Sequence, residues 1–186
     1  DGARLLTGGI GRKEEPVREG FFRELEVDHT RFNERSTVLT VDLEEWFHLD
    51  ESVVPPGEWD GLPSRVEENT RGLLDLLQAR GARATFFVLG WVAARHQGLL
   101  RAIRERGHEL ATHGYMHRCV AAMTETEFLS DLRRAREAVE ASGCEPVRGY
   151  RAARWSLGGI PGGGRRGSAS GLATAPLDAL IRDGFR

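Results

Sequence analysis

The chain has 186 residues, of which 40% are hydrophobic and 29% are charged, a composition typical of one globular domain with a core of its own. Its 26 basic and 28 acidic residues leave a net charge of −2, which does not favour nucleic acid or a membrane surface as a partner. No apolar run approaches the roughly 18 residues of a membrane span, and no signal-peptide pattern opens the sequence. The sequence predicts neither a compartment nor an oligomeric state.

Three acidic side chains follow the first predicted strand. Residues 1–36 are dense in charge and show no lasting period, so we expect a mostly irregular extension there. The strand is expected at 37–42, an uninterrupted β-branched and apolar run of the kind that is buried on both faces. The strand runs into three closely spaced carboxylates, Asp42, Glu44 and Glu45. Carboxylates there are costly unless solvated, paired or metal-bound, so a functional role is preferred over an acidic first helical turn.

Helices and strands alternate along the chain that follows. Further buried strands are expected at 83–89, 107–112 and 146–151. The expected helices cover 64–80, 91–106 (with a break near 98) and 124–142. Ser64 and Glu67 match the capping-box pattern at the start of the first helix. Thr124 and Glu127 match it at the start of the last. The alternation predicts a parallel α/β architecture with right-handed crossovers.

A glycine-rich segment at 158–171 breaks this pattern, because it holds almost no residues that can build a core. We expect a flexible linker there. A helix over 177–183 follows, with Gly184 as its C-terminal cap. The chain is therefore divided into an extension, 1–36, and one α/β domain, 37–186.

Two histidines, His113 and His117, stand four residues apart after the strand expected at 107–112. On one helical turn, or on a tight loop of similar pitch, both imidazoles face one side, and a divalent cation such as zinc accepts two such nitrogens. In α/β folds, ligands gather at the carboxyl ends of the strands. The spacing alone is weak evidence. The acidic cluster on an earlier strand end, and Arg148 and Arg151 on a later one, favour a metal site.

Four motifs in order carry a family resemblance. They are T-V-D-L-E-E-W-F at 40–47, A-T-F-F-V-L-G-W at 84–91, G-H-E-L-A-T-H-G-Y-M-H at 107–117 and R-G-Y-R-A-A at 148–153. Together they resemble the polysaccharide deacetylases of carbohydrate esterase family 4, the NodB-homology domain. The first is similar to the T-V-D-V-E-D-W-F of the branch found beside exopolysaccharide loci, which is related to the allantoinase-like and peptidoglycan deacetylases. The last departs from the family, with Ala153 where proline is expected.

The resemblance implies the fold and the metal. The fold would be a distorted (β/α) barrel of parallel strands alternating with helices, of which 37–186 holds the N-terminal part. One divalent ion, with zinc expected, would be held by His113, His117 and Glu44. Glu45 is the alternative carboxylate ligand, because the commoner family residue at its position is aspartate.

The resemblance also implies a reaction, the metal-dependent hydrolysis of acetamide groups on a bacterial polysaccharide, which is the partner expected. Asp42 would be the general base, and Arg151 would orient or tune it. Trp46 is a candidate for stacking on sugar rings, with core packing as the favoured alternative. Tyr115 is a candidate for the groove wall.

Two functions of different class remain open. In the family, a later aromatic motif and a general-acid histidine follow, and this sequence stops at Arg186 before either. One expectation is that the chain is the N-terminal part of a deacetylase that is active at full length. The other is a non-catalytic metal- or glycan-binding remnant. Activity on a small ureide is less favoured, because loss of the metal histidines would mark it and both are kept.

Overall fold

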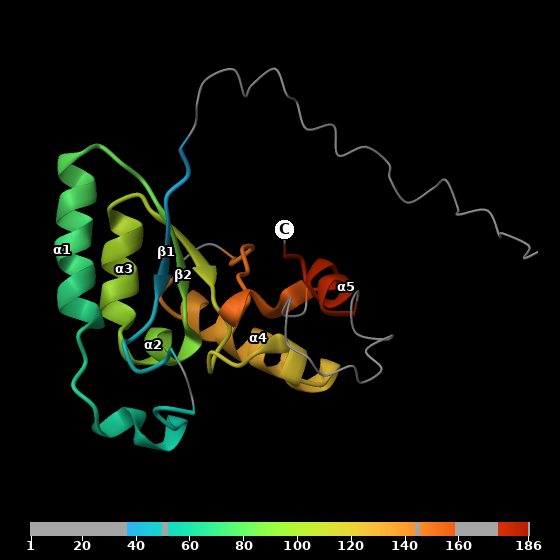
Figure 1. Ribbon diagram of the computed structural model, residues 1–186. Helices are drawn as coiled ribbons and strands as arrows, with labels where there is room; N and C mark the ends of the chain where they lie inside the picture. Colours follow the sequence, from blue (N-terminus) through green and yellow to red (C-terminus); the bar gives the residue numbers. More distant parts are fainter. Residues whose placement is uncertain (1–36, 50–51, 144–145, 159–174, 186) are drawn as a thin grey trace, which may run out of the picture. The chain divides into compact units, whose positions relative to one another are not determined.

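The structure is a computed structural model that describes residues 37–49, 52–143, 146–158 and 175–185 (Figure 1). The extension expected at 1–36 lies outside these residues, as does all but the first residue of the expected linker. No helix in the described ranges is both long enough and apolar enough to cross a membrane.

Three parallel strands form the sheet, in the order β1-β2-β3. They are β1 (Thr40–Leu43), β2 (Thr85–Val88) and β3 (Glu109–Thr112). The register pairs Asp42 with Phe87, and Phe87 with Ala111. All three strands therefore end at one edge of the sheet, where the sequence places its polar motifs. The predicted parallel α/β architecture is confirmed.

The strand expected at 146–151 is much shorter than predicted. It forms a single parallel bridge, between Thr112 and Tyr150. Two backbone hydrogen bonds support the bridge, from Thr112 N to Gly149 O at 2.9 Å and from Arg151 N to Thr112 O at 3.0 Å. The close approach needs glycine, because a Cβ on Gly149 would lie 2.9 Å from the Cβ of Ala111. The segment still delivers Arg151 to the edge where the strands end.

Helices flank the sheet (Figure 1). They are α1 (Val66–Ala79), α2 (Gly90–Arg95), α3 (Gln97–Glu105), α4 (Glu125–Glu140) and α5 (Ala175–Arg182). Short 3-10 turns cover Pro56–Gly61, Val120–Ala122 and Ala153–Gly158. In Figure 1, α1 and α3 run side by side on one flank, while α4 lies beyond β3 on the other. The central strand, β2, buries alternate side chains in the core, Phe86 and Val88, while Thr85 and Phe87 are partly exposed.

The helix expected at 91–106 is two helices, α2 and α3, which meet at His96 rather than near 98. His96 has φ −122° and ψ 45°, values outside the helical region. The start of α2 is tied to the loop after β3, because Gly90 N donates to Gly114 O at 2.8 Å and Trp91 N donates to Tyr115 O at 3.1 Å. The carboxyl ends of β2 and β3 are thereby joined through their loops.

The two predicted capping boxes have different outcomes. The box of Thr124 and Glu127 is present at the start of α4, with both reciprocal hydrogen bonds. The capping box predicted for Ser64 and Glu67 does not form. Among the described residues, Arg65 occupies the N-cap position of α1 and makes no side-chain cap. A carboxylate from another part of the chain takes this place, as described below.

The core is built from aliphatic and aromatic side chains that the strands and helices share. Phe86 and Val88 of β2 are fully buried, together with Leu74 of α1 and Leu100 of α3. Burying each such side chain contributes about 1.5–3 kcal/mol relative to exposure. A second group of rings, Phe47, His48, Trp59 and Trp91, packs edge to face beneath the end of β1. This ring cluster supports the turn that follows β1.

Candidate metal centre

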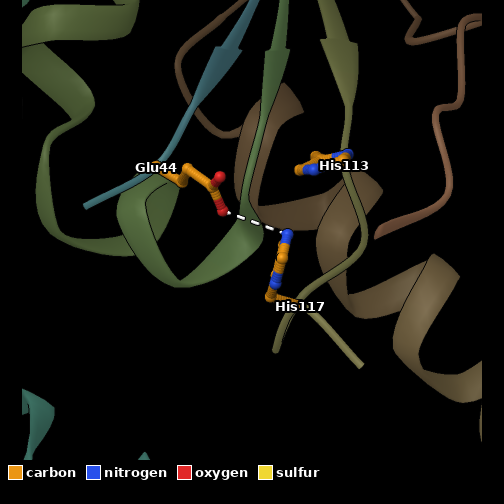
Figure 2. A group of neighbouring side chains, drawn as sticks. All are labelled: Glu44, His113 and His117. Atoms are coloured by element: carbon orange, nitrogen blue, oxygen red, sulfur yellow. Dashed lines mark ion pairs between the residues drawn. The ribbon is translucent and has the colours of Figure 1, made fainter. Parts of the chain in front are cut away.

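Glu44, His113 and His117 converge at the edge where the strands end (Figure 2). Each offers one ligand atom, and the three atoms lie within 4.8 Å of one another. Glu44 Oε2 is 3.2 Å from His117 Nε2. Glu44 follows β1 and the histidines follow β3, so the site joins strands that are not neighbours in the sheet. A carboxylate with two imidazoles is a donor set that zinc and similar divalent ions accept.

His113 has a defined tautomer. Its Nδ1 lies 2.8 Å from the carbonyl oxygen of Arg151. Because a carbonyl only accepts, Nδ1 must carry the proton and Nε2 must present its lone pair. A hydrogen bond from the far nitrogen to a backbone carbonyl is what orients metal-binding histidines in general. The bridging segment at Tyr150 thus supports the site through its backbone.

The two histidines are carried by a tight loop and not by a helical turn. Gly114 has φ 76° and His117 has φ 54°, both in the left-handed region. For histidine this conformation is uncommon and carries strain, which proteins tend to hold at functional sites. The side chain of Asp131, from α4, fixes the middle of the loop, since its Oδ2 accepts from Tyr115 N at 2.7 Å. The ring centroids of His113 and His117 come to 5.1 Å.

The electrostatics of the three residues suit a cation. Burial, and then the charge of Asp42, raise the pKa of Glu44 to about 7. Burial, and then His113, lower the pKa of His117 to about 4, and burial lowers the pKa of His113. Both imidazoles are therefore neutral at pH 7 and have lone pairs to donate. Within the described chain, the buried Glu44 Oε2 has no hydrogen-bond donor, so a bound cation would satisfy it.

Asp42 and Arg151 form an ion pair beside these ligands. Arg151 Nη1 donates to Asp42 Oδ1 at 2.6 Å, and Nη2 donates to Thr40 Oγ1 at 2.9 Å. The guanidinium also lies 4.0 Å from the ring centroid of Phe87. These three contacts fix the guanidinium from different sides, while Asp42 keeps a third of its side chain exposed. The carboxylate is thus both oriented and accessible.

Glu45, the alternative ligand, lies outside this group. Only 2% of it is exposed, and its carboxylate accepts hydrogen bonds from the backbone N–H groups of Arg65 and Val66 and from the hydroxyl of Ser64. Its oxygens are thus already occupied at the start of α1. Of the two candidates, the geometry favours Glu44.

The aromatic candidates separate into one exposed and one buried. Trp46 is 53% exposed and its Nε1 donates to Pro63 O at 3.2 Å, so the expectation of core packing is wrong. Tyr115 is buried, with Arg134 stacked 3.7 Å from its ring centroid, which places it in the core rather than on an open wall. A cavity of about 290 Å³ opens beside the end of β1 and is lined in part by Asp42, Glu44 and Trp46.

Two features of the site were not predicted. Trp155 is 78% exposed, and the guanidinium of Arg151 lies 5.3 Å from its ring centroid. Arg154 and Trp155 both have left-handed backbones, with φ 55° and 54°. The only sequence signal was an aromatic residue two positions after the fourth motif. Thr112, directly before His113, is buried with its hydroxyl unpartnered among the described residues.

The parallel strands and the residues at their carboxyl edge define a NodB-type α/β domain of carbohydrate esterase family 4. The chain belongs to the polysaccharide deacetylase family, because its residues 56–157, more than half of its length, match the family model described as "Polysaccharide deacetylase". The resemblance inferred from the four motifs is therefore confirmed.

Individual relatives match over limited lengths. The peptidoglycan-N-acetylglucosamine deacetylase PgdA of Listeria monocytogenes is 32% identical over 80 residues, which are 43% of this chain and 16% of that protein. The chain therefore spans a small part of this relative. A family 4 carbohydrate esterase from Streptomyces lividans, solved with acetate, aligns with a TM-score of 0.56 at 19% identity, over 80% of this chain and 59% of that one. A family 4 pseudoenzyme from Bacillus anthracis aligns with a TM-score of 0.58 at 15% identity, over 82% and 42%. These two show the shared fold.

Proposed function

We propose that this chain contributes to the metal-dependent N-deacetylation of a bacterial polysaccharide, the hydrolysis of acetamide groups on N-acetylated sugars. One observation carries the proposal, the convergence of Glu44, His113 and His117 beside the Asp42–Arg151 pair. Membership of the polysaccharide deacetylase family supports it. The reaction class is the hydrolysis of a linear amide, a C–N bond outside any ring.

The metal in this proposal is a single divalent ion, with zinc as our choice. Nε2 of His113, Nε2 of His117 and the carboxylate of Glu44 would hold it, and three protein ligands leave a position open. When bound there, such an ion withdraws electron density from an acetamide carbonyl and so makes it easier to attack. The neutral imidazoles and the unpartnered Glu44 oxygen fit this role.

Asp42 would be the general base. It takes a proton from the attacking water, whose oxygen bonds to the acetamide carbon. As the C–N bond breaks, the nitrogen would accept the proton that Asp42 took from the water and leave as the sugar amine, with acetate as the second product. Arg151 would orient Asp42 through its charge-assisted hydrogen bond. The Asp42 carboxylate keeps about a third of its side chain exposed, so a water molecule can reach it.

Polysaccharide binding would use the exposed indole of Trp46. This ring stands at the cavity rim, and its N–H is held by Pro63 O, so its face is free to stack on a sugar ring. Tyr115, the other aromatic candidate, lies in the core, so it has no place in the proposed substrate contacts.

A second candidate function is the binding of metal or glycan without catalysis. The observation that favours it is the departure at Ala153, after which two residues in sequence adopt left-handed backbones. The existence of a pseudoenzyme with this fold shows that the architecture does not by itself require activity.

Zinc titration and acetate release test the two functions. We expect one zinc ion per chain by calorimetry, and His113→Ala to weaken it by more than the roughly 10–100-fold that loss of an outer contact costs. His96→Gln, at a histidine outside the site, is the control and should bind normally. With N-acetylglucosamine oligomers, Asp42→Asn should reduce acetate release by about 10²–10⁴-fold. Zinc binding without acetate release would support the second function. The absence of zinc binding would contradict both metal-dependent deacetylation and non-catalytic metal binding.

A further inference from the structure

Glu45 connects the end of β1 to the start of α1. Its Oε2 accepts from Arg65 N at 3.0 Å, its Oε1 accepts from Val66 N at 3.2 Å, and the hydroxyl of Ser64 also donates to it. These partners lie 19–21 residues further along the chain. The first N–H groups of a helix lack intrahelical partners and carry partial positive charge, so a buried carboxylate is well placed there. Glu45 therefore serves as the cap of α1 from a distance.

The backbone of Glu45 is held as firmly as its side chain. Its N–H donates to His48 Nδ1 at 2.9 Å, and its carbonyl accepts from His48 N at 3.0 Å. His48 is itself 1% exposed, within the cluster formed with Phe47, Trp59 and Trp91. The turn after β1 is thus closed on itself and fastened to α1.

This anchoring has a direct consequence for Glu44. The two neighbouring carboxylates face opposite ways: Glu45 contacts the start of α1, whereas Glu44 faces His113 and His117 (Figure 2). Holding Glu45 in place therefore also fixes the backbone that carries Glu44. Glu44 Oε2 lies 3.2 Å from His117 Nε2 and receives no hydrogen bond from the described residues, so side-chain contacts hold this oxygen only weakly.

We propose that Glu45 is a positioning residue that clamps the turn after β1 onto the start of α1 and so presets Glu44 for the metal. The inference rests on the proposed function, since it assigns Glu44 as a ligand. Glu45 touches neither metal nor substrate, and its effect passes entirely through the backbone of the turn.

Glu45→Gln tests the clamp, because the amide nitrogen that replaces one oxygen cannot accept from a backbone N–H. In the metal-free protein, we expect faster hydrogen exchange at the amides of Glu45, His48, Arg65 and Val66. For zinc, we expect affinity to fall by about 10–100-fold, as when other outer partners of a ligand are lost. Glu67→Gln is the matched control, because it removes the same charge from the first turn of α1 without contacting the turn after β1. It should leave both readouts unchanged.

A double-mutant cycle separates positioning from a general loss of stability. In a Glu44→Gln background the ligand is already gone, so Glu45→Gln should no longer change zinc affinity. An equal loss in both backgrounds would overturn the proposal, and so would unchanged exchange at these amides in Glu45→Gln. If Glu45→Gln does not fold, Ser64→Ala removes one arm of the clamp, and unchanged exchange at Glu45 and His48 would then overturn the proposal.

The exchange measurement also separates this inference from the proposed function. It is made without metal, so its result decides whether the clamp exists. If the unaltered chain binds no zinc, the proposed function fails, while exchange at the turn after β1 still reports whether Glu45 holds it.

Discussion

The guanidinium of Arg151 lies 2.6 Å from the carboxylate of Asp42, although 109 residues separate them in the chain. The contact depends on the bridge at Tyr150, which brings the segment of Arg151 to the end of β3, and on the sheet, which brings the end of β1 to the same edge. The proposed base therefore comes from the first strand and the residue that orients it from the segment that bridges to the third strand, and the two meet at one edge of the sheet.

Replacing Arg151 with lysine should lower activity without preventing folding. Lysine keeps the charge but loses the planar fork that contacts Asp42 and Thr40 together. Losing a charge-assisted hydrogen bond of about 1.5–3 kcal/mol corresponds to roughly a 10–100-fold decrease in kcat. Acetate release at several substrate concentrations measures the effect. Arg148→Lys, at an exposed arginine of the same segment, is the control, and an equal decrease in both variants would contradict this role for Arg151.

Zinc binding should release a proton at acidic pH. Because the pKa of Glu44 is raised to about 7, the metal-free carboxyl is protonated below that pH, and metal must displace the proton. His117 is already neutral there, since its pKa is lowered to about 4, and burial lowers the pKa of His113 in the same direction. Zinc affinity should therefore rise about tenfold per pH unit from pH 5.5 toward 7 and then level off. Calorimetry in buffers of different ionisation enthalpy counts the protons. A Glu44→Gln variant should lose the dependence.

Asp131 should support the histidine loop. Asp131→Ala leaves the backbone N–H of Tyr115 without its acceptor, which costs about 1–3 kcal/mol when the group stays buried. Urea unfolding should show this loss, and zinc calorimetry should show weaker binding. Asp131→Asn retains an oxygen that can accept, so it should be closer to the original protein. Wild-type zinc affinity in Asp131→Ala would show that the loop holds its shape without this contact.

Two glycines should respond in opposite directions to alanine. A Cβ on Gly90 would lie 2.5 Å from Tyr115 Cδ2 and 3.0 Å from the Cα of Ala135, so Gly90→Ala should destabilise by about 1–3 kcal/mol. Gly72 lies within α1 with open space around it, so Gly72→Ala should stabilise by about 0.5–1 kcal/mol. Both free energies of unfolding can be measured in denaturant. Stabilisation of similar size in both variants would mean that helix propensity, and not the contact with Tyr115, decides the outcome.

The sequence by itself determined the features that depend on near neighbours. The β-branched and apolar runs predicted β1 and β2, because such residues favour strands. The expectation that the first strand is buried on both faces is wrong, because within β1 only Leu43 is fully buried and Asp42 is exposed. Thr124 and Glu127 predicted the start of α4, because a capping box joins groups three residues apart. The four motifs were sufficient to identify the family, since they occur in order along a single chain.

Only the tertiary structure decided which polar groups meet. Glu44 and Glu45 are adjacent and chemically alike, so nothing local could assign one to the histidines and the other to α1. Their opposite directions follow from the contacts of Glu45 with Arg65 and Val66, about twenty residues away. The failed box at Ser64 has the same cause, because a distant carboxylate satisfied the helix first. Local patterns determine helices and strands, whereas the partners of a buried charge depend on which segments the fold brings together.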